Sequence, residues 1–230
     1  MSLWTITRLV AAKDLRVEAR SRVMTNQVLP FAGLVMVTFA FALDTSAGDS
    51  LLNQVAPGLV WLATLFSLLV VVQRSFAVES ADGALDALRV AGVHPGGVFL
   101  GKSLALAVQL AVLEALLLFA AVVLYQTEVR ASGIVVLLVT YVAATCGLAF
   151  VGTIYGGLAA GARGRETLLP LLLLPVVAPV LIGATRATEA ALGTNDATPG
   201  EGWPWIGLLL LFAALFGAGG TLAFGSLIDE

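Results

Sequence analysis

The residues of this chain with the most recognisable chemical spacing are the eight from Gly96 to Ser103, GGVFLGKS. They match the pattern G-x-x-x-x-G-K-S, in which backbone amides that follow a buried strand and open a helix surround phosphate groups. Here a polar segment with Pro95 precedes the pattern, and a long apolar run follows it. A phosphate-binding helix would therefore lie in lipid. The context favours a turn at Gly96 and Gly97, with Lys102 anchoring a membrane span, over an ATP-hydrolysing enzyme.

A second group of polar residues lies just before that pattern. Glu79, Asp82 and Asp86 are spaced three and four residues apart, so they share one face of a helix. Apolar side chains lie on the other faces of the same stretch: Phe76, Leu85 and Leu88. An acidic helix at a membrane surface binds anionic lipid poorly and suits the docking of a protein with basic or apolar grooves. A solvated charged face explains the same pattern equally well.

Two polar side chains, Gln109 and Glu114, lie inside a long apolar run and are five residues apart. A carboxyl group in the middle of a bilayer is costly, so Glu114 should face protein or water and should have a partner. One hypothesis is that it lines a substrate path or a mobile helix interface. The alternative is a protonated or hydrogen-bonded carboxyl group with a structural role.

Ligands for a metal or a haem iron are scarce in this chain. His94 is its only histidine, and Met24, Met36 and Cys146 form no recognisable ligand pair. We therefore expect no bound cofactor and no stable haem ligation. An intramembrane enzyme is disfavoured, because the sequence has no Ser-His-Asp set and no paired intramembrane acids. A nucleic-acid partner is not suggested either, because no basic patch is interleaved with aromatic residues.

The elements that carry these residues are membrane spans. The chain has 230 residues, of which 59% are apolar and 12% charged, whereas a soluble domain has about 25% charged residues. A span needs about 20 apolar residues and must be helical, because lipid cannot satisfy open backbone groups. Six candidate spans satisfy this requirement: 23–43, 56–72, 100–125, 134–160, 168–187 and 205–227. The fifth contains three prolines, so we expect it to be kinked or broken.

The basic residues predict an orientation. If the spans alternate, ten of the twelve lysines and arginines lie on the side of the N-terminus, and only Arg130 and Arg186 lie on the other. Cytoplasmic loops carry such an excess. The N-terminus, the 74–99 loop, the 161–167 loop and the C-terminus are therefore predicted to be cytoplasmic.

Residues 1–22 mix apolar and basic side chains. Ile6, Val10 and Val17 fall near one helical face, and basic residues follow at short intervals. This pattern predicts a helix that lies along the membrane interface. A basic leader without a fixed structure is the alternative.

Residues 56–102 resemble a known family. The second span begins with A-P-G-x-x-W at Ala56–Trp61, a loop reads D-G-x-L-[DE]-x-L at Asp82–Leu88, and Gly101 and Lys102 open the third span. These features look like those of haem exporter protein B, the CcmB family, which is the permease subunit of the bacterial cytochrome c maturation transporter. The chain length, the six spans and the proline-rich fifth span are similar as well.

The resemblance implies an all-α membrane protein: a single permease domain over residues 1–230, of the ABC-2 or type II exporter kind, without an ATPase of its own. In this family a separate ATPase subunit docks on cytoplasmic coupling helices. The positions that match this role, at the start of the 74–99 loop, are Phe76, Glu79, Asp82, Gly83, Leu85, Asp86 and Leu88.

The resemblance also implies partners and a location. The partners are a CcmA-like ATPase subunit, a second copy of the chain, a CcmC-like haem-handling protein, a small CcmD-like protein and the periplasmic haem chaperone CcmE. The location is the bacterial inner membrane, and the role is haem export or release of the loaded chaperone during c-type cytochrome assembly. A permease for another substrate and a scaffold that transports nothing remain alternatives.

Overall fold

The computed structural model describes residues 2–43, 49–81, 92–160 and 165–228, and every regular element in these ranges is a helix. The long helices are α1 (Leu3–Ser21), α2 (Leu29–Leu43), α3 (Asp49–Ala81), α5 (Pro95–Leu124), α6 (Ile134–Ala160), α7 (Arg165–Leu192) and α8 (Gly202–Ile228). Short helical turns accompany them: η1 (Met24–Val28), η2 (Ala131–Gly133), η3 (Thr194–Asp196) and η4 (Pro199–Glu201).

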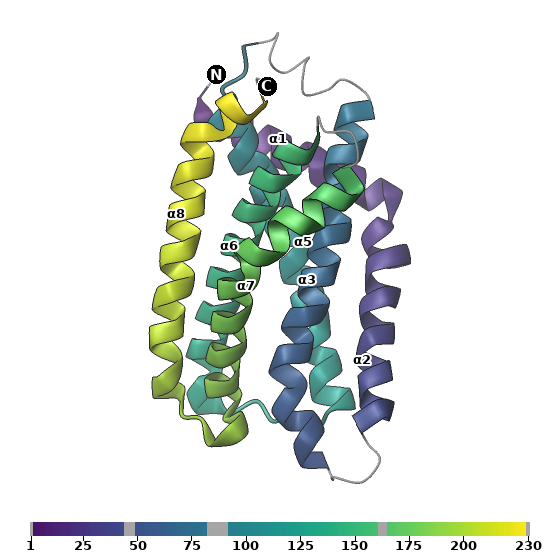
Figure 1. The fold of residues 1–230 in the computed structure, drawn as a ribbon, viewed down its shortest axis with the longest axis vertical. Coiled ribbons are helices and arrows are strands. Elements are labelled where there is room, and N and C mark those ends of the chain that lie inside the picture. The colour runs from purple at the N-terminus through teal and green to yellow at the C-terminus, as the bar shows by residue number, and fades with distance from the viewer. Residues whose placement is uncertain (1, 44–48, 82–91, 161–164, 229–230) are drawn as a thin grey trace.

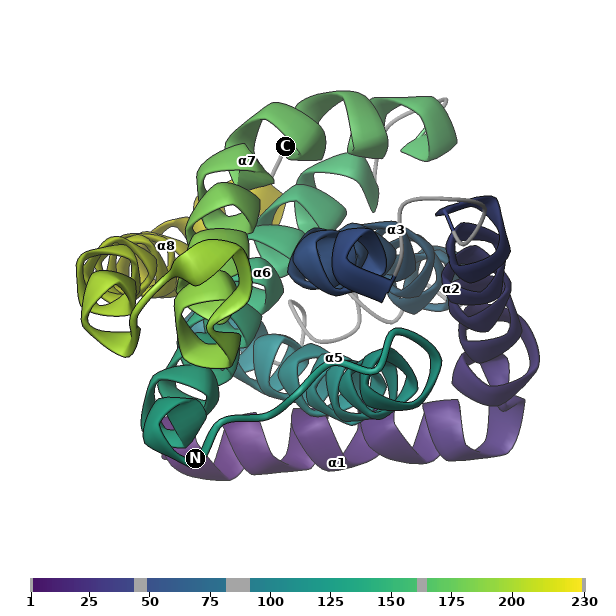
Figure 2. The same cartoon turned by 90° about the horizontal axis from the view of Figure 1, so that it is seen from below.

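The long helices form one bundle with a helix across its end. Helices α2, α3, α5, α6, α7 and α8 run side by side, with α2 and α8 at opposite edges (Figures 1 and 2). Within the described ranges, six helices are long and apolar enough to cross a membrane, which confirms the six predicted spans. Helix α1 lies across the bundle end where α3 finishes and α5 begins, as expected of a helix at a membrane interface (Figure 1).

Two helices extend beyond the predicted spans. The second span is predicted over 56–72, and α3 runs over 33 residues, Asp49–Ala81, with Pro57 inside it. Hydropathy marks only the part of a helix that lies in lipid, and no glycine or proline from 74 to 81 ends the helix. Helix α5 likewise begins at Pro95, so the loop expected over 74–99 is helical at both of its ends.

The prolines of the fifth span bend the helix without breaking it. Helix α7 is continuous and contains Pro170, Pro175 and Pro179. Figure 1 shows it changing direction along its length. A proline inside a helix removes one hydrogen bond and crowds the preceding turn, which produces a kink. The expectation of a kinked span is confirmed.

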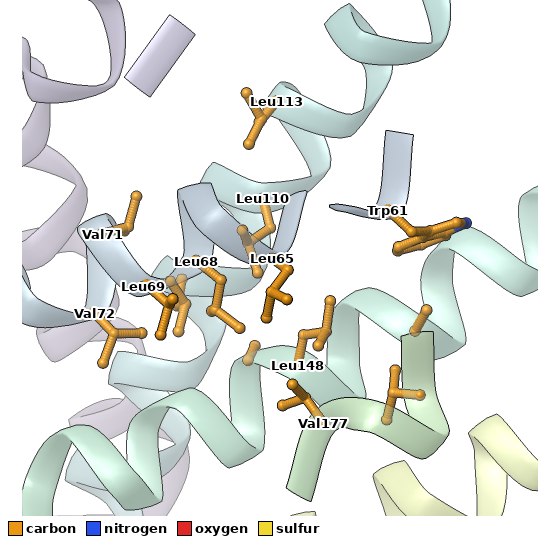
Figure 3. Close-up of a cluster of buried hydrophobic side chains, with 14 of the residues drawn as sticks. Trp61, Leu65, Leu68, Leu69, Val71, Val72, Leu110, Leu113, Leu148 and Val177 are labelled. Atoms are coloured by element: carbon orange, nitrogen blue, oxygen red, sulfur yellow. The ribbon is translucent and has the colours of Figure 1, made fainter. Parts of the chain in front are cut away.

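The core of the bundle is built around the buried face of α3. Leu65, Leu68 and Val72 pack there with Leu110 of α5 and Leu148 of α6 (Figure 3). Helix α6 makes close contacts with four neighbours, α3, α5, α7 and α8. It therefore lies in the interior of the bundle.

Glycines allow α6 to approach its neighbours closely. A Cβ atom at Gly156 would lie 2.5 Å from the ring of Phe76, and one at Gly157 would lie 3.0 Å from the ring of Phe224. In lipid no hydrophobic effect drives helices together, so membrane helices associate through close packing. Small residues permit this close approach. The aromatic rings of α3 and α8 thus occupy the space that side chains at these glycines would take.

Replacing Gly156 with alanine should destabilise the fold by about 1–3 kcal/mol, because the new methyl group overpacks the contact with Phe76. Thermal unfolding of the purified protein in detergent, followed by tryptophan fluorescence, measures the change. Gly33→Ala in α2 is the matched control, since nothing lies within 4 Å of a Cβ atom there. Equal melting temperatures for the two variants would contradict the proposed packing role.

Candidate functional site

The G-x-x-x-x-G-K-S pattern lies in the first turns of α5, not in a loop. His94 is the N-cap residue, and the helix begins at Pro95. The expected turn at Gly96 and Gly97 is therefore wrong, because both residues are helical. The Gly96 amide donates to His94 Nδ1 at 3.2 Å, and the Gly97 and Val98 amides donate to the His94 carbonyl oxygen. The amides that would hold a phosphate at this helix end are thus already bonded.

The glycines of the pattern make room for α1. A Cβ atom at Gly97 would lie 2.8 Å from Ile6, and one at Gly101 would lie 2.6 Å from Val10. Ile6 and Val10 are buried in this contact. The predicted apolar face of α1 is therefore the face that packs on α5, although Val17, predicted on the same face, is exposed.

The lysine of the pattern is buried and bonded. Lys102 is 3% exposed, and its Nζ lies 3.3 Å from Asp14 Oδ2 of α1 and 3.5 Å from Ser75 Oγ of α3. The same ammonium group lies 4.5 Å from the ring centre of Phe76, a cation–π distance. We call Asp14, Ser75, Phe76 and Lys102 the Lys102 cluster. It joins α1, α3 and α5 at one end of the bundle.

The Lys102 cluster lies beside the segment predicted to contact an ATPase. Phe76 was expected to be part of that contact, but it is 4% exposed and lies under Lys102. It supports the end of α3 and does not line an open surface. The backbone of Glu79 belongs to the last turns of α3. The other predicted contact residues lie outside the described residues: Asp82, Gly83, Leu85, Asp86 and Leu88.

The two intramembrane polar residues face different sides of α5. Side chains five residues apart in an α-helix point in directions that differ by about 140° around the helix axis. Gln109 lines a small cleft with Asp14 of α1 and Arg74 of α3. Glu114 is 1% exposed and faces α6, where its Oε2 accepts a hydrogen bond from Thr145 Oγ1 at 2.5 Å. The expected partner on a neighbouring helix is thus present for Glu114, but the structure does not bring the two residues together.

A set of polar contacts near Glu114 was not predicted. Trp61 Nε1 of α3 donates to Thr188 Oγ1 of α7 at 3.0 Å, and the Trp61 ring lies 5.1 Å from the Tyr141 ring of α6. The Thr145 hydroxyl oxygen also lies 2.6 Å from the Tyr141 carbonyl oxygen, so its single proton is shared between two nearby acceptors. These contacts link four helices in mid-bundle. The only signal in the sequence was Trp61 itself, since a buried indole N–H usually finds a partner.

The described part of the chain contains no group of three or more histidine, cysteine, aspartate or glutamate residues that could hold a metal ion. His94 caps α5 through its Nδ1, and Cys146 is a half-buried free thiol on α6. The candidate sites are therefore the Lys102 cluster and the carboxyl group of Glu114.

Six helices long and apolar enough to span a membrane, with a further helix lying across their ends, define a polytopic α-helical membrane protein. The model of the CcmB protein family matches residues 5–220. The chain belongs to the CcmB family.

Curated relatives agree with this assignment. Heme exporter protein B of Pseudomonas aeruginosa is 30% identical over 214 residues, which cover 90% of this chain and 87% of the relative. Heme exporter protein B of Haemophilus influenzae is 30% identical over 91% of this chain and 90% of the relative. The protein of the same name from Escherichia coli K12 is 30% identical over 83% of each chain.

Lys102→Met should destabilise the protein by about 1–3 kcal/mol, because it removes the buried partner of Asp14, whose side chain is only 11% exposed and keeps its ion pair with the exposed Lys13 at 3.0 Å. Adding Asp14→Asn should recover part of this loss, since the carboxylate that has lost its buried partner is then removed. Melting temperatures of the two single variants and the double variant in detergent give the coupling between the two residues. Arg16→Met, an exposed position on α1, is the control. Additive effects of the two substitutions would show that the pair makes no net contribution.

Proposed function

We propose that this chain is the membrane permease subunit of an ABC-type system that exports haem, or releases a haem-loaded chaperone, for c-type cytochrome assembly. The observation that carries the proposal is the family match, which spans residues 5–220 and so includes five of the six candidate membrane helices and most of the sixth. Relatives that cover more than four fifths of the chain at 30% identity are named heme exporter protein B.

ATP hydrolysis belongs to a separate subunit in this proposal. The phosphate-binding pattern supports this division, because Gly97 and Gly101 contact α1 and Lys102 is bonded to Asp14. Ser103 Oγ lies 3.0 Å from Thr153 Oγ1 of α6 and is buried. The residues that would hold a nucleotide and its magnesium ion thus serve helix packing in this chain.

The ATPase subunit docks on the segment from Glu79 to Leu88. Helices α3 and α5 flank this segment, and the Lys102 cluster fixes their adjacent ends to each other and to α1. A movement that the ATPase subunit imposes on the segment between Ala81 and Pro95 is therefore transmitted to α1, α3 and α5 together. This arrangement suits a permease that converts an ATPase movement into a tilt of its spans.

The chain lies in the bacterial inner membrane with both termini in the cytoplasm. Ten of its twelve basic residues lie on that side if the spans alternate. The first residues of α1 and the last residues of α8 lie at the same end of the bundle (Figure 1).

Its partners in this system are the ATPase subunit, a second copy of the chain, CcmC-like and CcmD-like membrane proteins and the periplasmic chaperone CcmE. Haem is a substrate that the complex handles, and the chain holds no resident cofactor. The single histidine supports this view, because its Nδ1 caps α5.

Reversing two charges tests the docking segment. Asp82→Lys with Asp86→Lys should abolish co-purification of the ATPase subunit, because an acidic surface becomes basic where a complementary partner docks. Glu128→Lys, an exposed acidic position in the connection between α5 and α6, is the matched control and should leave co-purification unchanged. Retention of the ATPase by the double variant would count against this docking site.

The transport role is tested by complementation. The chain should restore c-type cytochromes, measured by haem staining of membrane proteins, in a bacterium that lacks its own haem exporter B. The Asp82→Lys, Asp86→Lys variant should fail at equal membrane abundance, because it no longer couples to the ATPase. Full restoration by that variant would favour a scaffold over a permease, and no restoration by the unaltered chain would favour a different substrate.

A further inference from the structure

A groove runs between α5 and α6 on the outer surface of the bundle. It has a volume of about 420 Å³, and its lining is almost wholly apolar. Leu138 and Val142 of α6 line it and are 61% and 65% exposed, and Val108 of α5 is 40% exposed. The groove therefore opens toward the membrane, on the side of the bundle where lipid or another protein must cover it.

The base of the groove is polar. Glu114 lines it and is 1% exposed, and only its Oε2 atom is bonded, to Thr145. Among the described residues its Oε1 atom has no hydrogen-bond partner, and neither has the hydroxyl group of Tyr141, which lines the same groove. A buried polar atom without a partner is costly, most of all in a region without water.

The α5 wall of the groove has the spacing of a helix contact. Ala107, Ala111 and Ala115 line it at intervals of four residues, so they lie on one face and present a nearly flat surface. Small residues at this spacing let a second membrane helix approach closely. Glu114 directly precedes the last of these alanines. The close-approach surface therefore lies beside the buried carboxyl group.

We propose that this Glu114 groove docks a transmembrane helix of another membrane protein. That helix presents small residues to the three alanines and brings one hydrogen-bond donor, such as an asparagine, glutamine, lysine or arginine side chain, to the Glu114 Oε1 atom. A side-chain amide would bond the Tyr141 hydroxyl group as well.

Depth in the membrane excludes a lipid as the specific occupant. Glu114 is ten residues before the last residue of α5, which places it about 15 Å from that end of the helix, at the level of acyl chains. Acyl chains carry no hydrogen-bond donor, and headgroups do not reach this depth. Only a protein side chain can satisfy the carboxyl oxygen there.

Symmetry argues against a second copy in this groove. A two-fold interface brings the same surface of both copies together, and residues at its axis meet their own copies. Two copies packed with the axis at Glu114 would place the two carboxyl groups against each other, and the groove lining contains no basic side chain that could pair with either. The occupant is therefore a different protein that supplies the complementary donor.

Photo-crosslinking of the full complex in native membranes tests the proposal. Benzoylphenylalanine at Leu138 or Val142 should give an adduct with one transmembrane peptide of another protein, identified by mass spectrometry, that carries a donor residue. Leu211 on α8 and Leu34 on α2, 69% and 65% exposed at the edges of the bundle, are the control positions and should not give this adduct.

Substitutions then test the role of the carboxyl group. Glu114→Leu should lower the adduct yield by about tenfold, as expected for the loss of one hydrogen bond between membrane helices. Gln109→Leu, on another side of α5, should leave the yield unchanged. Tyr141→Phe keeps the ring contact with Trp61 and should lower the yield less than Glu114→Leu.

Three results would overturn the proposal: adducts with lipid only, adducts with a second copy only, or equal yields from Glu114→Leu and the unaltered chain. The melting temperature in detergent verifies that the Glu114→Leu variant is folded. Retention of the ATPase subunit is measured in the same samples, so a failure of this docking site is distinguished from a failure of the proposed function.

Discussion

The bundle depends on close contact between helices that lipid cannot push together. In water, burial of apolar side chains drives helices into contact, but a leucine loses nothing by facing an acyl chain. Dispersion contacts and a few hydrogen bonds must hold the helices instead, and both require short distances. Glycines provide those distances where α5 meets α1 and where α6 meets α3 and α8. The positions of α1 and α6 follow from this constraint.

The same constraint explains why a charged group is buried at the end of α5. Close packing of α1 on Gly97 and Gly101 carries Asp14 toward Lys102, and the short distance lets the two side chains bond. The Phe76 ring and Ser75 complete the surroundings of the ammonium group. An interfacial helix is thereby attached to the spans by packing and by charge together. Such a helix cannot slide on the bundle without breaking the buried ion pair between Asp14 and Lys102.

Much of the fold could be predicted from the sequence, because hydropathy records which residues lie in lipid. The fourth span was predicted at 134–160, and α6 has the same bounds. Hydropathy could not give the ends of α3, since that helix continues into polar residues beyond the membrane. Polar residues within the spans could be recognised from their residue types, but the residues that they bond to could not. The bond between Trp61 and Thr188 joins residues 127 positions apart, and no local pattern encodes such a contact.

The pattern G-x-x-x-x-G-K-S shows why residue types alone do not define a site. A phosphate loop and a close helix crossing both need glycine, since each brings another group against the backbone. The difference lies in the amides. A phosphate loop leaves its amides free for the anion, whereas the Gly96, Gly97 and Val98 amides are bonded to His94. The residues from Gly101 onward lie within the continuous helix α5, where amides bond to preceding carbonyl groups. With its amides occupied and its lysine held by Asp14, the same eight-residue pattern that binds a nucleotide elsewhere positions α1 here.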